Sequence, residues 1–303
     1  MPPAGTITTL ADQASAGTGE RPFLLRRTGA DEGGALDPAV LVRERPGGTE
    51  VLPITDPERQ RPEFDFAKAW RHFRIVLKDK EQTDQIVAVA DALPWRGVGE
   101  AASAFLATER GRAIFQAEPY LPDFLDDHAL LRGTRPNSFA HAYCDFMERE
   151  SLTAAGMVAA TSARQQFGDG VDWYVDRLRD FHDILHIVTG YGRDLLGEQC
   201  IFAFMYNQRP SPGHLVLAWA GTLLMKAKMR SKAPVVRALM EARRNGKRCP
   251  RIVEMPIQEL FAMPLTTVRE MLNVPEPHWY HKAMEVWRAE GVDPHAFLAK
   301  QPT

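Results

Sequence analysis

Cysteine is scarce in this chain of 303 residues, which contains only Cys144, Cys200 and Cys249. No two of them form a CxxC pair, so the spacing excludes a zinc ribbon and a redox-active thiol pair. Three cysteines also cannot build the disulfide framework of a small secreted domain. The expected compartment is therefore a reducing one.

Long hydrophobic runs are absent as well. The longest, LVLAWAGTLLM at 215–225, has 11 residues, whereas a membrane-spanning helix needs about 20. Residues 1–20 contain no lysine or arginine. A secretory signal peptide begins with basic residues and a mitochondrial transit peptide is rich in arginine, so neither is expected. These absences favour a bacterial-type cytoplasmic protein.

Neither sign of charge dominates, because the formal net charge is -2 at pH 7. A nucleic-acid-binding domain would carry a broad basic surface, so we expect no nucleic-acid partner. The sequence also lacks internal repeats, a GxGxxG fingerprint and a P-loop, so no dinucleotide- or nucleotide-binding residues are predicted. The hydrophobic fraction of 45% is enough for one sizeable core.

Apolar residues at spacings of three and four predict an all-α fold, a single multi-helix domain without a strand pair. Residues 1–62 are rich in glycine, proline and charge and predict a mostly disordered N-terminal extension, with room for one extended piece that folds back on the body. Residues 63–275 are the predicted helical domain, and residues 276–303 a C-terminal helix and tail.

The predicted helices follow the apolar periodicity along the domain. Residues 122–135 lack that periodicity and predict a loop. The predicted helical ranges are 64–79, 83–93, 99–116 with an interruption near 109–111, 137–150, 171–189, 194–206, 215–230, two short helices within 255–274, and 277–291.

The chemically informative stretch is FHDILHIVTGYGRDLLGE at 181–198. On a helix, His182 and His186 lie one turn apart on the same face, so both imidazoles can reach one ion. Glu198 would lie roughly 120° around an unbroken helix. We therefore expect a break at the intervening glycines, Gly190 and Gly192, with Glu198 returning on a following segment. Two histidines with carboxylates predict a metal site.

Asp183 is the fourth candidate of this stretch. It lies about 100° from His182 on a helix, so it can bind a metal only from the edge of the site. Its alternative role is to accept a hydrogen bond that fixes an imidazole tautomer. The plainer alternative for the whole motif is a pair of core histidines.

A second enzyme class uses similar residues. Phosphohydrolases of the HD type need a further histidine upstream and a distant aspartate downstream. His141 is available upstream, but after Asp194 the next aspartate is Asp293 in the tail. His141 also lies in a run of aromatic residues at helical spacing, which is typical of a core. The phosphohydrolase interpretation is therefore weak.

A basic stretch follows the apolar run at 215–225. Residues 226–251 contain ten basic residues and one acid, Glu241. An apolar helix that leads into a basic one is typical of a membrane-surface element, because anionic headgroups attract each cation by about 1 kcal/mol. The alternatives are a solvated face or a face that docks a partner.

The spacing His182-Asp183-x-x-His186-x11-Glu198 resembles the HDxxH-x11-E signature of the coenzyme Q (ubiquinone) biosynthesis protein 4 family. The resemblance covers roughly residues 66–274. Its flanking matches are Gly190, Tyr191, Asp194, Gly197, Phe202 and Phe204, with 111–119 and 139–146 upstream and 258–272 downstream.

The resemblance implies an all-α protein in which His182, Asp183, His186 and Glu198 bind a divalent metal and act in catalysis. The metal is expected to be zinc, with iron or manganese as alternatives. The implied reaction is removal of the C1 carboxyl group from a polyprenylated 4-hydroxybenzoate intermediate, by a decarboxylase-like lyase. Simple protonation and oxidative decarboxylation with hydroxylation both stay open.

The family also implies peripheral association with a membrane and binding of a polyprenylated phenolic lipid. Because no transit peptide is expected, the membrane would be a bacterial-type inner membrane. Residues 201–204 and 215–225 are the predicted walls of the prenyl groove. The alternative function is a non-catalytic scaffold or prenyl-lipid-binding organiser that holds other ubiquinone-pathway enzymes together. A homodimer is a further open alternative.

Overall fold

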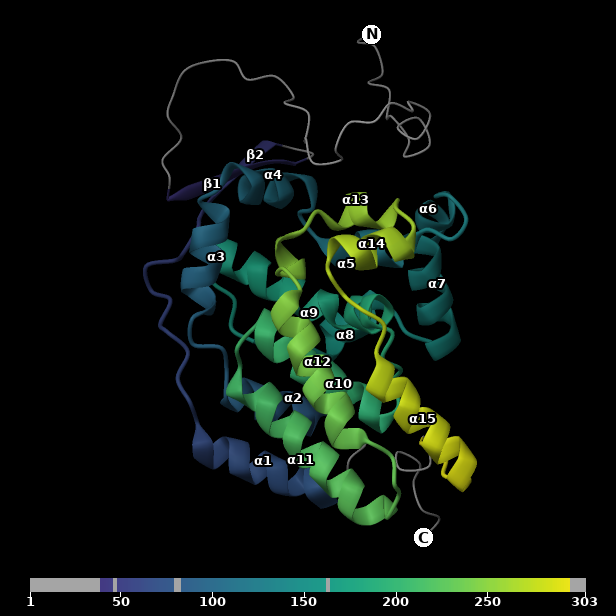
Figure 1. Ribbon diagram of the computed structural model, residues 1–303. Coiled ribbons are helices and arrows are strands. Elements are labelled where there is room, and N and C mark those ends of the chain that lie inside the picture. The colour runs from purple at the N-terminus through teal and green to yellow at the C-terminus, as the bar shows by residue number, and fades with distance from the viewer. Residues whose placement is uncertain (1–38, 46–47, 79–82, 162–163, 295–303) are drawn as a thin grey trace.

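The structure, a computed structural model, describes residues 39–45, 48–78, 83–161 and 164–294 (Figure 1). Helices dominate these ranges, so the predicted all-α class is confirmed. The helices are α1 (Phe66–Lys78), α2 (Thr83–Ala92), α3 (Val98–Leu106), α4 (Glu109–Ala117), α5 (Leu121–Asp126), α6 (His128–Arg132), α7 (Phe139–Glu150), α8 (Ala154–Thr161), α9 (Gly170–Thr189), α10 (Leu195–Gln208), α11 (Pro212–Met229), α12 (Val235–Arg248), the 3-10 turn η2 (Ile252–Glu254), α13 (Ile257–Phe261), α14 (Leu265–Met271) and α15 (His278–Glu290).

One antiparallel hairpin accompanies the helices, so the prediction that the chain has no strand pair is wrong. Strands β1 (Val40–Arg45) and β2 (Gly48–Pro53) pair with Val40 opposite Pro53. A two-stranded hairpin is marginal in water, but this one packs Leu41 into a core cluster with α3, α4 and α9. The sequence signal is weak because the stabilising contacts come from the helices.

Residues 39–45 and 48–62 therefore belong to the folded body. The remainder of the predicted disordered extension, residues 1–38, lies outside the described residues, as does the end of the predicted tail, 295–303. The predictions for those two segments stay predictions.

Residues 122–135, predicted as a loop, contain most of α5 and all of α6. The prediction is wrong because helices of five and six residues are too short to display a period of 3.6. Their ends are set locally instead. Asp127 caps α6 by accepting the N–H of Leu130, and Pro122 occupies the first turn of α5, where its missing N–H costs no hydrogen bond.

Helix α9 is the central element, surrounded by helices in Figure 1. It contacts α3, α7, α8, α14 and η2, and most of its residues are buried. A helix that is covered on nearly every side has its orientation fixed by packing. The two predicted metal-binding histidines therefore lie on a rigid support.

The first turn of α9 is held by the segment that follows the hairpin. Asp169 caps the helix by accepting the N–H of Asp172. The Arg59 guanidinium donates to both carboxylates, at 2.7 and 2.8 Å. The N–H of Val171 donates to the carbonyl of Ile54 at 3.1 Å. Hydrogen bonds to charged groups are stronger than neutral ones, so this end of α9 is firmly attached.

A buried ion pair fixes the middle of the same region. Arg177 Nη1 lies 2.6 Å from Glu118 Oε2, and each side chain is only 2% exposed. Arg177 also donates to the carbonyls of Val253 and Met255. The pair thus joins α9 to the segment after α4 and to η2.

Replacing Glu118 with glutamine is expected to lower the free energy of unfolding by roughly 3–5 kcal/mol, because Arg177 would stay buried without its carboxylate. Urea denaturation measures the change. The matched control is Glu100→Gln, which removes the exposed pair with Arg61 (59% and 65% exposed) and should cost about 0.5 kcal/mol or less. Equal losses in the two variants would contradict the assignment.

Candidate metal centre

The chain reverses between α9 and α10, as the two glycines predict. Gly190 ends α9 in the left-handed region with φ 77°, which glycine adopts without strain. Asp194 then caps α10 by accepting the N–H groups of Leu196 and Gly197. A Cβ on Gly197 would lie 1.9 Å from the carbonyl oxygen of Gly192. The first turn of α10 can therefore rest directly on the turn that precedes it.

This reversal brings Glu198 opposite the two histidines. Its Oε2 lies 3.6 Å from His182 Nε2, and its Oε1 lies 3.5 Å from His186 Nε2. The two imidazole rings are 5.2 Å apart and edge to face. Three of the four predicted ligands thus converge, with their ligand atoms all within 4.8 Å of one another.

The hydrogen bonds of His186 leave a lone pair directed at this group. Its Nδ1 lies 3.0 Å from the carbonyl oxygen of Tyr191, which can only accept, so the ring hydrogen is on Nδ1. Its Nε2 is buried and has no hydrogen-bond partner. Fixing one ring nitrogen on a backbone carbonyl is how proteins orient histidine ligands.

The two N···O separations fit a shared ion better than hydrogen bonds. A good N–H···O bond is about 2.7–3.2 Å long, shorter than the observed 3.5 and 3.6 Å. Two ligand atoms that each lie about 2.0–2.1 Å from one Zn²⁺ at a tetrahedral angle are roughly 3.4 Å apart. The donor set is therefore compatible with zinc, and equally with other metals that histidine and carboxylate bind.

The electrostatics of the group also favour a cation. Burial alone would lower the pKa of His186, but the charge of Glu198 raises it above its ordinary value. Burial alone would raise the pKa of Glu198, yet the two imidazoles hold it well below its usual range. Glu198 is thus an ionised carboxylate that needs a positive partner, which a proton on His186 or a metal ion can supply.

Asp183 lies outside the three-residue group. Its side chain is buried, and its charge contributes to the raised pKa of His186. Burial is the main reason that the pKa of Tyr143 is raised, and Asp183 adds to that shift. The metal-ligand role of Asp183 therefore stays a prediction.

Aromatic rings surround the histidines. Phe146 of α7 stacks on His186 at 5.7 Å, and the ring of Phe202 lies 6.5 Å from that of His182. Phe202 also stacks on His214 at 5.8 Å, and Arg209 donates to His214 Nε2 at 2.8 Å. Burial and the charge of Arg209 lower the pKa of His214 well below its ordinary value, so its ring is neutral.

Sequence reasoning missed Arg209 and His214. They lie in and after the NQRPSPG segment, which shows no metal-ligand spacing. It also assigned Ile201 and Phe204 to a lipid groove, whereas both are fully buried in the main core. Only the partly exposed Phe202 faces the histidines. A narrow cleft is formed elsewhere by α9, the end of α10 and η2, lined by Leu178, Phe181, Leu185, Met205, Gln208, Arg209, Ile252 and Val253, and none of the candidate metal ligands lines it.

The phosphohydrolase interpretation gains no support. His141 Nε2 lies 3.1 Å and 3.2 Å from the carbonyl oxygens of Arg132 and Thr134. Its ring is thus bonded to the backbone between α6 and α7 and joins no metal-type group within the described ranges.

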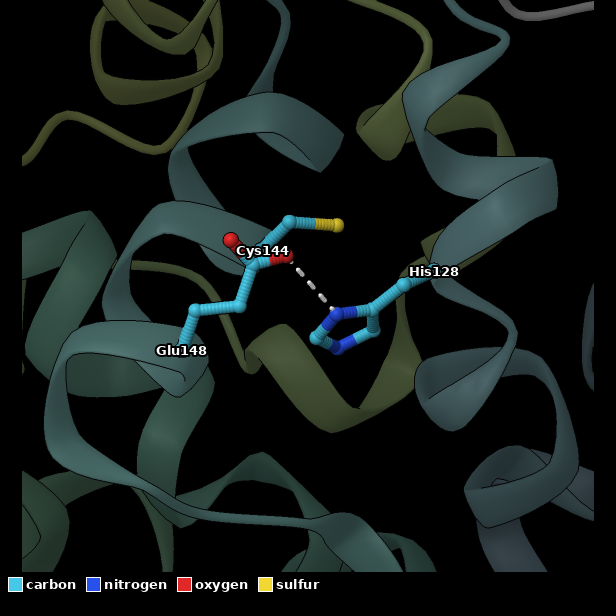
Figure 2. A group of neighbouring side chains, drawn as sticks. All are labelled: His128, Cys144 and Glu148. Carbon is cyan, nitrogen blue, oxygen red and sulfur yellow. Dashed lines mark hydrogen bonds and ion pairs between the residues drawn. The ribbon is translucent and has the colours of Figure 1, made fainter.

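A second group of metal-type side chains occurs at His128, Cys144 and Glu148 (Figure 2). His128 Nδ1 is 3.1 Å from Glu148 Oε1, and Arg132 donates to the same carboxylate at 2.9 Å. Burial raises the pKa of the Cys144 thiol, which keeps it protonated. Because a guanidinium already neutralises Glu148, this group is a poorer metal site than the one between α9 and α10.

Metal-free protein titrated with Zn²⁺ or Co²⁺ is expected to bind one ion per chain. Substituting a residue that only orients a metal ligand costs roughly 10–100-fold in metal affinity. His186→Ala removes a proposed ligand itself and should therefore cost more than about 100-fold. Calorimetry or metal analysis after dialysis gives the measurement. His128→Ala is the matched control and should bind normally. The opposite pattern would move the metal to the second group.

The candidate site lies within a stretch of the chain that matches a known protein family. Residues 71–278 match the family described as "Coenzyme Q (ubiquinone) biosynthesis protein Coq4". The chain is 24% identical over 206 residues to the mitochondrial ubiquinone biosynthesis protein COQ4 homolog of Bos taurus, covering 67% of this chain and 75% of that protein. It is 29% identical over 123 residues to the homolog of Leishmania major, covering 40% of this chain and 63% of that protein.

A solved structure shares the fold. A protein from Nostoc punctiforme PCC 73102, described as a ubiquinone biosynthesis protein, matches with a TM-score of 0.52 and 21% identity. The match covers 71% of this chain and all of that one. The family match spans more than half of the sequence and includes both histidines and Glu198. The chain therefore belongs to the Coq4 family of coenzyme Q (ubiquinone) biosynthesis proteins.

Proposed function

We propose that this protein removes the C1 carboxyl group from a polyprenylated 4-hydroxybenzoate intermediate of ubiquinone synthesis in a metal-dependent reaction. The observation that carries the proposal is the buried, unpartnered Nε2 of His186 facing the ionised Glu198. The side chains of His182 and Glu198 are 22% and 24% exposed. A ligand can therefore reach the group from that side, as a catalytic site requires.

In this mechanism the protein's own residues hold the reacting groups. The carbonyl of Tyr191 fixes the ring of His186, and Glu198 supplies one negative charge. A bound zinc ion would act as a Lewis acid and stabilise negative charge on the substrate's oxygens. The apolar rings of Phe146 and Phe202 exclude water from two sides of the histidines, which strengthens every charge interaction there.

The proposed reaction breaks the bond between C1 and the carboxyl carbon. The bonding electron pair stays on C1, a proton from water takes the vacated position, and CO₂ leaves. The oxidative form consumes O₂ and water as co-reactants and leaves a hydroxyl group on C1, with CO₂ and hydrogen peroxide as the other products. An iron or manganese ion suits that form, because two histidines and one carboxylate also bind such metals. The product's mass distinguishes the two forms.

The scaffold function is the second candidate, and the basic surface favours it. Eight of the ten basic residues in 226–251 are exposed; they are Lys226, Lys228, Arg230, Lys232, Arg237, Arg244, Lys247 and Arg248. Most lie at the end of α11 or along the outer face of α12. Such a surface can bind acidic partners, including other enzymes of the pathway.

Membrane contact is proposed for the end of the molecule formed by α1 and α11. Phe66 and Trp70 of α1 are 69% and 60% exposed, and Leu223 of α11 is 53% exposed. Both helices pack on α2 and lie at one end of the fold (Figure 1). Exposed aromatic and aliphatic residues beside basic ones suit the surface of an anionic bilayer, here the cytoplasmic face of a bacterial-type inner membrane.

No helix in the part of the chain that the structure describes has the length and apolarity to cross a bilayer.

Cells that lack their own copy of the gene are expected to make ubiquinone when given this protein, and to accumulate the carboxylated prenyl-phenol when given His186→Ala. The variant removes the His186 Nε2 that faces Glu198. Mass spectrometry of extracted lipids is the measurement, and the folded level of each protein is checked alongside.

His128→Ala serves as the matched control and should restore ubiquinone. If His186→Ala restores it equally well, the metal group is not catalytic and the scaffold function takes its place.

Binding to anionic vesicles is expected to fall at least tenfold in the double variant Phe66→Ser, Leu223→Ser. Burying such a side chain contributes about 1.5–3 kcal/mol, and 1.4 kcal/mol corresponds to about tenfold. Sedimentation with vesicles measures the partition. Leu130→Ser is the control, because Leu130 is 43% exposed on α6 at the opposite end of the fold. Equal loss in the control would refute the proposed face.

A further inference from the structure

We propose that Tyr280 of α15 is a positioning residue for the metal centre. Its hydroxyl and ring hold the turn between α9 and α10 in the conformation that places Glu198 opposite His186. The inference rests on the proposed metal site, but it concerns a different residue from a different helix.

The hydroxyl of Tyr280 joins two groups of the turn. It donates to Asp194 Oδ2, and it accepts the N–H of Gly192 at 2.9 Å. The other oxygen of Asp194 accepts the N–H groups of Leu196 and Gly197. Glu198 follows the cap by four residues, which is one helical turn. The position of Glu198 along α10 therefore depends on an aspartate whose second oxygen is bound to Tyr280.

The ring of Tyr280 contacts the residue that orients His186. It packs edge to face on the ring of Tyr191, with centroids 5.4 Å apart. The carbonyl of Tyr191 accepts the Nδ1 hydrogen of His186. Tyr280, which lies outside the motif, thus contacts both Asp194, which positions Glu198, and Tyr191, which orients His186.

The contact between Tyr280 and Asp194 leaves no room for a side chain at position 192. A Cβ on Gly192 would lie 2.7 Å from the Tyr280 hydroxyl and 2.9 Å from Asp194 Oδ2. Any side chain at position 192 would therefore push the hydroxyl and the carboxylate apart. Both residues are buried, Tyr280 at 6% and Asp194 at 2% exposure, so water does not readily replace the lost bond.

Tyr280 lies outside residues 71–278, the range that matches the family. The contact is therefore made by a helix that extends beyond the family match. The same helix buries Trp287 in the main core, which fixes its position against α12. The turn is held by an element that is itself firmly packed.

The test compares Co²⁺ binding by the full-length protein with that of Tyr280→Phe. Outer-shell substitutions cost roughly 10–100-fold in metal affinity, so we expect a loss in that range. We also expect a changed visible spectrum of the bound Co²⁺, because Glu198 would no longer be held in place. Gly192→Ala should give the same two changes. Trp287→Phe is the matched control, since it weakens the packing of α15 about two turns away and keeps the hydroxyl.

Urea unfolding in the presence of a chelator reports the stability of each variant without metal. The inference is supported if Tyr280→Phe and Gly192→Ala bind Co²⁺ more weakly than Trp287→Phe at a similar loss of stability. It is overturned, with the metal site intact, if Tyr280→Phe binds with the affinity and spectrum of the wild type. An equal loss of affinity in Trp287→Phe overturns it as well. If the wild type binds no Co²⁺, the proposed metal site itself fails.

Discussion

The geometry of the candidate site depends on a reversal of the backbone within five residues. A single helix cannot place Glu198 on the face of His182 and His186, because the twelve-residue step from His186 leaves it roughly 120° away. The chain meets this constraint by ending α9 at Gly190 and starting α10 at an aspartate cap. The absence of a side chain on Gly197 allows α10 to approach the turn within contact distance. The site is thus a property of a junction between two helices.

The chemistry of the site follows from what this junction leaves unsatisfied. His186 is completely buried, one of its nitrogens is bound to a backbone carbonyl, and the other faces a carboxylate at 3.5 Å. A buried lone pair opposite a negative charge is unfavourable without a positive charge between them. In the buried ion pair of Arg177 with Glu118, by contrast, the guanidinium bonds to the carboxylate and to two backbone carbonyls. This difference makes the first arrangement the candidate binding site and the second a fold-stabilising contact.

Sequence reasoning recovered the features that local signals encode. The apolar period predicted 171–189 and 194–206, close to α9 and α10, and the glycines predicted the break. The hairpin, α5 and α6 were missed because short elements depend on contacts with distant segments. The contact between Tyr280 and Asp194 was missed as well, because the two residues are 86 positions apart and form no metal-ligand spacing with each other. Arg209 and His214 were missed because their segment shows no metal-ligand spacing. Ile201 and Phe204 were assigned to a lipid groove because apolar residues of a core and of a cleft look alike in sequence, and the structure buries both in the core.

The contacts at the two ends of α9 involve parts of the chain that the family match does not cover. Arg59 holds the first turn of the helix, and Tyr280 holds the turn that follows it. Both residues lie outside the range 71–278 that the family match covers. The part of the chain that matches the family therefore depends structurally on residues outside it. A fragment cut at those limits would keep all the metal-ligand candidates and lose both of these contacts.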